Sequence, residues 1–352
     1  MIAKSVPEPA DGRRAGPEPI VIDGSFGEGG GQIIRTSLSA SLMTGTPVEL
    51  IHIRAKRSRP GLLAQHLTAV RAAAEIGNAG VDGDQLGSDR LTFRPGPVRP
   101  GKYRFDVGTA GSASLVLQTV LVPLAEAGGE SEVTISGGTH NVGAPPYEFL
   151  ELAFLPVLRR MGVDVDLQLV RPGFHPAGGG QIRATIREAQ WRPLTLTGRG
   201  EIRSVQARAI VSRLPVSIAH RELAVLEQRL GWPADALTAQ EVDAYGPGNA
   251  VVAIVESEHI TEVFTGFGRR GLPAEKVAES VADEVDDYLR AGVPVGVHLA
   301  DQLLLPIVRA PGSRFLTHSP SQHFETNLEV LRSFYATRIT VEETDAGILV
   351  RS

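Results

Sequence analysis

The stretch GEGGGQIIRTSLSASLMTG, residues 27–45, joins a turn of small residues to an apolar segment long enough to form a helix. The same arrangement recurs in GTAGSASLVLQTVLVPLAEAGG (residues 108–129) and in GVHLADQLLLPIVRAPG (residues 296–312). Three occurrences of one pattern in one chain predict a structural unit that is repeated three times.

Each of these segments is followed by a second expected helix that begins near a proline or a serine. In the first of them Leu63, Leu67, Val70 and Ala74 recur at spacings of three and four, which indicates one buried helical face. A hairpin-like stretch with alternating apolar residues then indicates strands that bury one face. The second helices are expected at residues 59–77, 144–162 and 319–336, and the hairpins at residues 81–96, 163–180 and 338–352.

Two helices on one face of a small sheet cannot enclose a core alone, so the three copies are expected to pack together. The predicted fold class is therefore α+β (α/β), with three repeated units of two helices packed on a four-stranded sheet. Chance similarity between short helices rich in alanine and leucine is the alternative interpretation.

A segment without this pattern, residues 199–292, is expected to form an inserted smaller α+β domain. The large domain then comprises repeats 1 and 2 over residues 20–198 and repeat 3 over residues 293–352. Residues 1–19, with their prolines and mixed charges, are predicted to be a flexible leader. The acidic run in the last helix of the insert, residues 279–287, is interpreted as a solvent-exposed face.

The composition excludes several classes of protein. The 352 residues include 42% hydrophobic side chains, enough for a full core, and the formal net charge of −5 excludes a generally basic nucleic-acid coat. The absence of cysteine excludes disulfides, thiol nucleophiles and cysteine–zinc sites, and it fits a cytoplasmic location. The apolar segment 114–125 is too short to span a membrane and carries Gln118, so a buried helix is expected there.

Three features carry possible chemistry. The glycine loop before residue 32 resembles neither a Walker A loop nor a dinucleotide fingerprint, and its Glu28 suits a site where a divalent cation separates a carboxylate from phosphates. Arg54, Arg57 and their basic neighbours precede a helix start, which favours anions. His323 lies near a helix start that serine can cap. Tight helix–strand packing, a solvated basic turn and a capping or core histidine are the structural alternatives, and the residues alone leave them open.

Together these segments resemble the RNA 3′-terminal phosphate cyclase family. The resemblance covers nearly everything after Ile20, and its segments follow one another in the family's order. The segments are DGSFGEGGGQIIRTSL (residues 23–38), IRAKRSRPGLLAQHLTA (53–69), GTAGSASLVLQTVL (108–121), SGGTHNVGAPP (136–146), GFHPAGGG (173–180), HLADQLLLP (298–306) and HFETN (323–327).

The resemblance implies an ATP-dependent enzyme that converts an RNA 3′-phosphate into a 2′,3′-cyclic phosphate. It implies His323 as the nucleophile that carries AMP, and Glu28 as a ligand to Mg²⁺ or Mn²⁺. It also implies a nucleotide site and a set of groups for phosphate or RNA. The nucleotide site is implied for Gln118, Pro145, His298, Leu299, Ala300, Asp301 and Gln302; the phosphate or RNA groups are Arg35, Arg54, Arg57 and Gln65.

The chain departs from the family's pattern at His298, where several members carry tyrosine, and an imidazole offers less stacking area. The expected partner is RNA with a 3′-phosphate end, with no membrane partner, and the oligomeric state is left open, a homodimer being one option. A non-catalytic RNA-binding scaffold of the same fold, acting in ribosome biogenesis, is the alternative function. Such scaffolds lack the nucleophilic histidine. A transferase of enolpyruvyl groups on a similar repeated architecture is a third hypothesis, and it predicts no covalent nucleotide.

Overall fold

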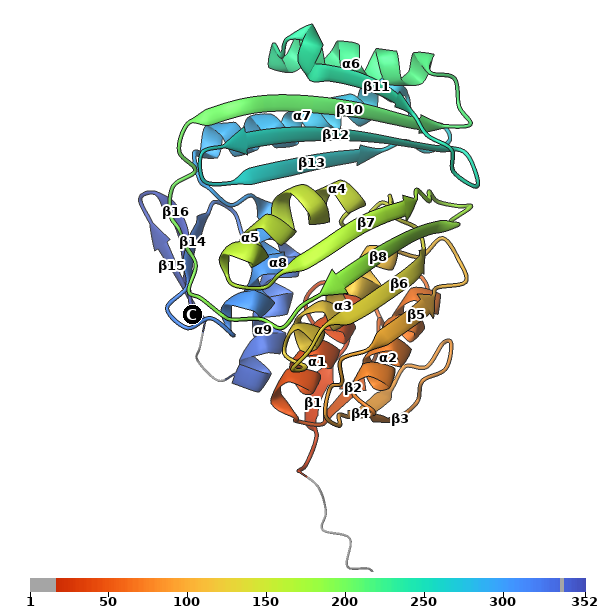
Figure 1. Ribbon diagram of the computed structural model, residues 1–352, viewed down its shortest axis with the longest axis vertical. Helices are drawn as coiled ribbons and strands as arrows, with labels where there is room; N and C mark the ends of the chain where they lie inside the picture. Colours follow the sequence, from red (N-terminus) through yellow and green to blue (C-terminus); the bar gives the residue numbers. More distant parts are fainter. Residues whose placement is uncertain (1–16, 336–338) are drawn as a thin grey trace, which may run out of the picture.

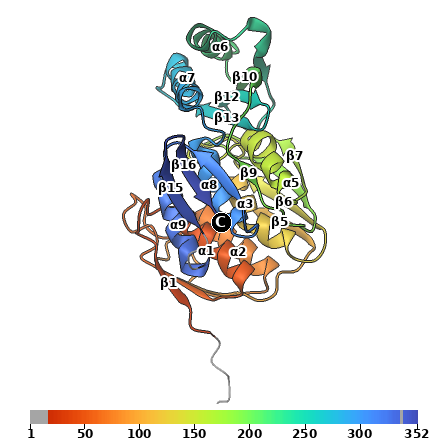
Figure 2. The same ribbon diagram turned by 90° about the vertical axis from the view of Figure 1, so that its left-hand side faces the viewer.

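The computed structural model describes residues 17–335 and 339–352, so the expected leader lies outside the described residues up to residue 16. The chain forms a large body with a smaller domain above it (Figure 1). Turned by 90°, the smaller domain is seen to sit on top of the body, with β13 as its strand nearest to the body (Figure 2). Within the described residues, no helix combines the length and the apolar character that crossing a membrane requires.

The body consists of three copies of one β-α-β-α-β-β unit, which confirms the predicted fold class. The first copy contains β1 (Ile20–Asp23), α1 (Gly31–Thr44), β2 (Val48–Ile51), α2 (Ala64–Ile76), β3 (Gly80–Asp82) and β4 (Leu91–Arg94). The second contains β5 (Lys102–Asp106), α3 (Ala113–Ala125), β6 (Ser131–Gly137), a helix made of α4 (Tyr147–Phe149), η1 (Leu150–Phe154) and α5 (Leu155–Arg160), then β7 (Val165–Arg171) and β8 (Gly180–Ile186). The third contains β9 (Thr195–Leu196), α8 (Val297–Ile307), β14 (Arg314–Thr317), α9 (Gln322–Tyr335), β15 (Thr340–Thr344) and β16 (Gly347–Arg351).

The three sheets share one topology. Their strand orders are β1-β2-β4-β3, β5-β6-β8-β7 and β9-β14-β16-β15. In each sheet the first pair is parallel and the other two pairs are antiparallel. The strand that opens each unit is short and was not anticipated from the sequence. In the third unit it is β9, which precedes the inserted domain in the chain and pairs with β14 after it.

Helices from all three repeats meet in one continuous core. Helix α1 packs against α3 of the second repeat and α9 of the third, and α8 packs against α9. Helix α3 has 12 of its 13 residues buried, because most of its side chains are apolar on every side of the helix. The buried hydroxyls of Ser114 and Thr119 donate to backbone carbonyl oxygens. Gln118 is the one residue of α3 that is only partly buried. The helix predicted at residues 114–125 is therefore buried, as expected.

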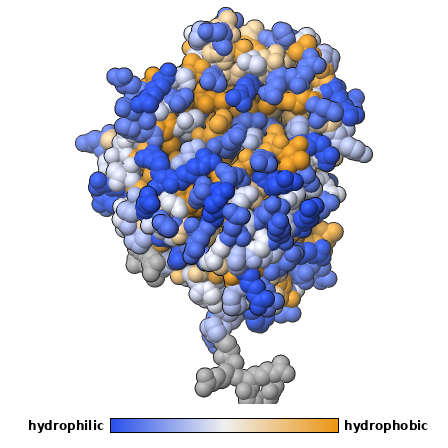
Figure 3. All heavy atoms as spheres, viewed as in Figure 1, coloured by the Kyte–Doolittle hydropathy of each residue, from blue (hydrophilic) through white to orange (hydrophobic). Residues whose placement is uncertain are grey.

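The inserted domain contains β10 (Ile202–Ser212), α6 (Ser217–Leu230), the short η2 (Ala234–Ala236), β11 (Leu237–Glu241), β12 (Gly248–Ser257), β13 (Thr261–Phe267) and α7 (Ala274–Ala291). Its sheet has the order β11-β10-β12-β13. Both faces of β12 are buried, since Val251, Ala253 and Val255 join the core under α6 and α7, while Val252 and Ile254 join the core of the body. The hydropathy view shows hydrophobic residues exposed mainly over the upper half of the molecule, with hydrophilic residues over most of the rest of this face (Figure 3).

Candidate active site

A cavity of about 420 Å³ lies between the inserted domain and the body. The body contributes α1, the loop before α4, the start of α8 and the first turn of α9, while the inserted domain contributes β13, the turn after it and α7. Six of the residues expected from the sequence line this cavity: Arg35, Pro145, His298, Asp301, Gln302 and His323. Side chains from all three repeats thus meet the inserted domain at one place.

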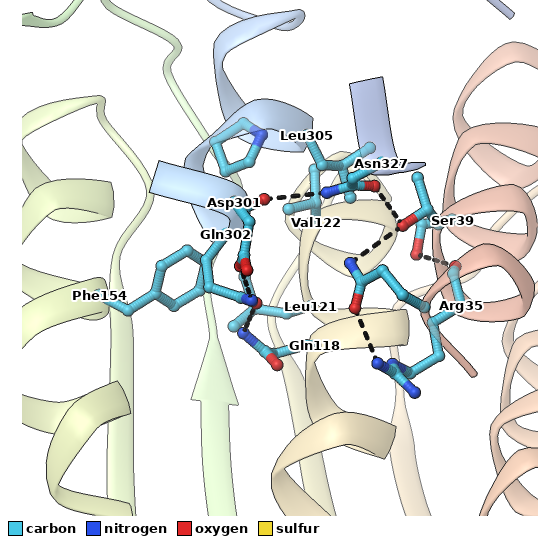
Figure 4. A pocket seen from close by; sticks show the side chains of 13 residues that line it. Arg35, Ser39, Gln118, Leu121, Val122, Phe154, Asp301, Gln302, Leu305 and Asn327 are labelled. Atoms are coloured by element: carbon cyan, nitrogen blue, oxygen red, sulfur yellow. Dashed lines mark hydrogen bonds between the residues drawn. The ribbon is translucent and has the colours of Figure 1, made fainter. Parts of the chain in front are cut away.

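A smaller cavity of about 40 Å³ adjoins this space, and Gln118 lines it (Figure 4). The side chains of Gln118 and Gln302 point toward each other there, and Gln118 Nε2 donates to Gln302 Oε1 at 2.6 Å. Gln302 in turn donates to the carboxylate of Asp301. Burial raises the pKa of Asp301 to about 7, because a charged carboxylate loses its hydration there. The hydrogen bond between the two glutamine side chains thus joins α3 to α8, and Gln302 extends it as a polar chain to Asp301.

The same polar chain extends into α9 and α1. Asn327 Nδ2 donates to the carbonyl oxygen of Asp301 at 2.9 Å, and Asn327 Oδ1 accepts from the hydroxyl of Thr36 at 2.6 Å. Arg35 Nη2 donates to Gln32 Oε1 at 2.8 Å. Burial lowers the pKa of Arg35 to about 10, which leaves the guanidinium cationic at neutral pH. A positive charge therefore faces both cavities.

His323 lies in the first turn of α9, at the edge of the larger cavity. Ser321 caps this helix, since its hydroxyl accepts the amide hydrogen of Phe324 at 2.9 Å, as the sequence predicted. Nδ1 of His323 lies 3.5 Å from Oε2 of Glu28. The pKa of His323 is lowered, first by burial and then by nearby cations, although the Glu28 carboxylate opposes that shift. The ring is therefore held in its neutral, nucleophilic form near neutral pH.

Glu28 presents one engaged and one free carboxylate oxygen. Its side chain is only 13% exposed, and Oε1 is paired with the guanidinium of Arg57, which also donates to the Glu28 carbonyl oxygen at 2.8 Å. Among the described residues, the buried Oε2 has no hydrogen-bond partner. An orphaned buried carboxylate oxygen fits a divalent cation, whose remaining ligands would be phosphate oxygens and water. No group of three or more acidic, histidine or cysteine side chains suited to a metal occurs within the ranges described.

The glycines of the loop allow close contact with α9. Gly27 has a φ of 52°, and a Cβ atom placed on it would lie 2.3 Å from Oγ1 of Thr326. That hydroxyl accepts the amide hydrogen of Glu28 at 3.0 Å, so it fixes the backbone that carries the carboxylate. A side chain at position 27 would occupy the place of the group that positions Glu28.

We expect Gly27→Ala to destabilise the fold more than Gly128→Ala does. Both positions have positive φ, so each alanine costs about 1–2 kcal/mol of backbone strain. A Cβ at Gly128 meets nothing within 4 Å, whereas the one at Gly27 overlaps Thr326 and adds about 1–3 kcal/mol of overpacking. Urea unfolding monitored by circular dichroism measures both free energies. Equal losses in the two variants would contradict a tight contact between the loop and α9.

The remaining expected residues lie around this centre. Arg54, with a φ of 54°, donates to the carbonyl oxygens of Arg59 and Gly61, so its guanidinium holds its own loop. Gln65 Oε1 accepts the amide hydrogen of Ser112 at 3.1 Å and thereby joins the first and second repeats. Neither Arg54 nor Gln65 lines either cavity.

Leu299 and Ala300 lie in the stretch expected to border the nucleotide, yet their side chains are buried in the core. Neither residue lines a cavity. A helix turns about 100° per residue, so His298, Asp301 and Gln302 face the cavities while the two residues between them face the interior. Their contribution is to anchor α8.

No pattern in the sequence indicates that the inserted domain lines the cavity. Phe267 and Arg269 from the end of β13 contribute to its wall, as does Glu284 of α7. Glu284 belongs to the acidic run that was interpreted as a solvent-exposed face. Its Oε2 lies 3.6 Å from Nε2 of His298 and raises the pKa of that histidine.

The fold and this site define an enzyme built from three repeats, with a neutral histidine beside a carboxylate at the edge of an interdomain cavity. The family model for RNA 3′-terminal phosphate cyclase matches residues 26–341. The chain belongs to the RNA 3′-terminal phosphate cyclase family.

Curated relatives agree with this assignment. The chain is 48% identical to the RNA 3′-terminal phosphate cyclase of Ectopseudomonas mendocina over 94% of this chain and 96% of that protein. It is 48% identical to the protein of the same name from Ralstonia nicotianae, over 96% and 98% of the two chains, and 47% identical to that of Salmonella typhimurium, over 94% and 98%. Among solved structures, an EPSP synthase from Acinetobacter baumannii has 12% identity and a TM-score of 0.34, covering 96% of this chain and 66% of that one.

Proposed function

We propose that this protein converts the 3′-terminal phosphate of RNA into a 2′,3′-cyclic phosphodiester, with ATP as the energy source and AMP carried on His323. The observation that carries the proposal is the position of His323. Its ring lines the interdomain cavity and Nδ1 lies 3.5 Å from a carboxylate oxygen of Glu28. A neutral histidine with one ring nitrogen facing a carboxylate leaves the lone pair of the other nitrogen available for nucleophilic attack.

The first step transfers AMP to the protein. In the neutral ring that carries its proton on Nδ1, the nitrogen on the side of Glu28, the lone pair on Nε2 attacks the α-phosphorus of ATP. The bond between that phosphorus and the bridging oxygen breaks, and pyrophosphate leaves with the electron pair. The positive charge that the ring acquires is stabilised by the Glu28 carboxylate.

The guanidinium groups near the site suit the anions of this step. Arg35 lines the cavity, and Arg57 is paired with Glu28 beside it. Guanidinium donors hold phosphate oxygens in fixed geometry, so these residues are assigned to the nucleotide phosphates or the RNA end. A divalent metal, when bound, supplies further positive charge to the phosphates, and Oε2 of Glu28 would hold it.

The adenine ring is assigned to the space between Pro145 and His298. Both residues line the cavity, Pro145 from the loop before α4 and His298 from the start of α8. A proline ring and an imidazole are both flat enough to stack on a purine. Gln118 and Asp301, joined through Gln302, are assigned to polar atoms of the nucleotide.

The later steps activate and close the RNA end. An oxygen of the RNA 3′-phosphate attacks the phosphorus on His323, the P–N bond breaks, and an RNA–adenylate anhydride results. The adjacent 2′-hydroxyl then attacks the 3′-phosphorus, loses its proton to solvent and expels AMP. This closure is intramolecular, and proximity of this kind lowers barriers by about 7 kcal/mol or more. A phosphate monoester dianion is a poor electrophile, and adenylylation supplies the leaving group that it lacks.

A terminal 2′-deoxyribose separates the steps of this mechanism. With ATP, Mg²⁺ and a 3′-phosphorylated RNA, we expect a cyclic end and release of AMP. With the same oligonucleotide ending in a 2′-deoxynucleotide 3′-phosphate, we expect the adenylylated anhydride to accumulate, because the closing hydroxyl is missing. Electrophoresis and mass spectrometry of the RNA products distinguish the two ends.

An oligonucleotide with a 3′-hydroxyl end serves as the control and is expected to remain unchanged. If the ribose end were cyclised with no AMP released, the covalent pathway would be wrong. If neither the protein nor the RNA ever acquired AMP, the non-catalytic scaffold would become the better explanation.

A further inference from the structure

The inserted domain caps a helix of the body. Glu262 lies on β13 and is 2% exposed, and its Oε1 accepts the amide hydrogen of Gly296 at 2.6 Å. Gly296 is the residue that precedes α8, and its backbone is extended. Amide groups at the start of a helix lack partners within the helix, so an acceptor oxygen placed there satisfies one of them. A side chain from one domain thus satisfies a donor at the end of a helix in the other.

This contact joins two walls of the interdomain cavity. Glu262 is followed directly on β13 by Val263, which lines the cavity together with Thr265 and Phe267. Gly296 precedes His298 by two residues, and α8 supplies the opposite lining. The hydrogen bond between Glu262 and Gly296 therefore lies one residue from a lining residue of β13 and two residues from a lining residue of α8. It sets the distance between these two walls.

The contact leaves little room for another arrangement. A Cβ atom placed on Gly296 would lie 3.2 Å from both Cδ and Oε1 of Glu262, so the glycine permits the close approach. Burial raises the pKa of Glu262 to about 8, against the opposing effects of the Gly296 amide and of nearby His298. An acceptor oxygen is present in either protonation state. The hydrogen bond, and not the charge, is therefore the constant part of the contact.

A second link between the domains is weaker. Glu284 of α7 approaches Nε2 of His298 at 3.6 Å, beyond hydrogen-bond distance, and both side chains are more than two fifths exposed. Exposed pairs of this kind contribute little to holding two elements together. Glu262 is buried and hydrogen-bonded, so it is the firmer of these two links.

We propose that Glu262 is a positioning residue for the nucleotide: by capping α8 from the inserted domain it sets the spacing of the cavity walls. The inference rests on the proposed function, since it assigns this cavity to ATP. His323 lies on α9, whose first turn is capped by Ser321 through the amide of Phe324, and its ring faces Glu28; neither feature involves Glu262. Loss of the Glu262 contact therefore weakens nucleotide binding and leaves the transfer of AMP to His323 at saturating ATP nearly unchanged.

The test measures nucleotide affinity apart from chemistry. The Kd of the full chain for α,β-methylene-ATP, which cannot transfer AMP, is obtained by calorimetry. Glu262→Ala is expected to raise this Kd about tenfold, since loss of a helix cap has an effect of this order. The KM for ATP in self-adenylylation is expected to rise equally, with the maximal rate within about twofold of the wild-type value. Glu262→Gln keeps an acceptor oxygen and is expected to retain wild-type affinity.

Glu222→Ala provides the matched control for losing a buried carboxyl group in the same domain. Glu222 on α6 is fully buried and accepts from Asn249 Nδ2 at 2.9 Å, entirely inside the inserted domain. This variant is expected to lower the unfolding midpoint and to leave the Kd unchanged. A Kd that rises as much in Glu222→Ala as in Glu262→Ala would overturn the proposal, because general loosening of the domain would then suffice.

Two further results would also overturn it: a Kd within twofold of wild type for folded Glu262→Ala, or a fall in maximal rate with no change in Kd. If the alanine variant does not fold, Glu262→Asp decides, because it keeps the carboxylate but withdraws it by one methylene group. Its Kd is expected to exceed that of wild type, and equality would refute the proposal. Wild-type protein that binds the analogue but never acquires AMP would refute the proposed function while leaving the role of Glu262 testable.

Discussion

His323→Ala is expected to abolish covalent labelling of the protein by ATP that carries its radioactive phosphorus at the α position. The alanine removes the atom that forms the P–N bond, so the proposed covalent intermediate cannot form. Loss of a nucleophile lowers the rate by at least about 10³-fold, and the larger losses known reach about 10⁶-fold. The label on the wild-type protein should be labile in acid and stable in alkali, as a phosphoramidate is.

The structure offers a matched control for this experiment. His220 is an exposed histidine on α6 of the inserted domain and lines neither cavity. His220→Ala is therefore expected to label like wild type. Peptide mapping of the labelled wild-type protein should place AMP on the peptide that contains His323. Full labelling of His323→Ala, or AMP on another peptide, would show that the nucleophile has been misassigned.

Glu28→Ala is expected to produce the second largest loss of labelling. The substitution removes both the proposed metal ligand and the carboxylate that faces the ring of His323. Oε2 of Glu28 is the orphaned buried oxygen assigned to the cation, and it also faces Nδ1. The midpoint of a Mg²⁺ titration of labelling should rise at least about tenfold, because loss of even an indirect partner of a metal ligand costs 10–100-fold in affinity. Labelling at saturating metal should also fall, since the ring loses the group that stabilises its charge.

Glu325→Ala is the control for removing one negative charge from the same region. Glu325 is exposed in the first turn of α9, two residues after His323. Its loss is expected to shift the Mg²⁺ midpoint by less than about twofold, because solvent screens an exposed charge. Identical midpoints for wild type and Glu28→Ala would remove Glu28 from the metal site. Equal shifts of the Mg²⁺ midpoint in Glu28→Ala and Glu325→Ala would show that Glu28 acts only through its negative charge.

The repeated architecture could be predicted because it depends on local patterns. Apolar residues at helical spacing in residues 64–76 and alternation after Val163 report which side of each element is buried. The cap of α9 by Ser321 is also local, since donor and acceptor lie three residues apart. The opening strands escaped prediction because β1 has four residues and β9 only two, too few for a period to appear.

The chemistry-bearing residues could be selected from the sequence, but their partners could not. Nothing in the glycine loop indicates that Arg57 pairs with Glu28, or that Arg54 instead holds the carbonyl groups of its own loop. Both arginines belong to one basic segment, and only the path of its backbone distinguishes them. Leu299 and Ala300 likewise belong to one segment with His298 and Asp301. Only the turn of α8 shows that their side chains point into the core and not into the nucleotide site.

By itself, the sequence determined that three similar units surround a common core, that a different domain interrupts them, and that a histidine begins the last long helix. Only the tertiary structure decided that Glu28 meets this histidine, and that Glu262 and Glu284 of the inserted domain meet the start of α8. The reason is physical: periodicity records whether a residue is buried, because burial repeats with the local backbone. Which residue it meets depends on how distant surfaces pack, and that information is spread over the whole chain.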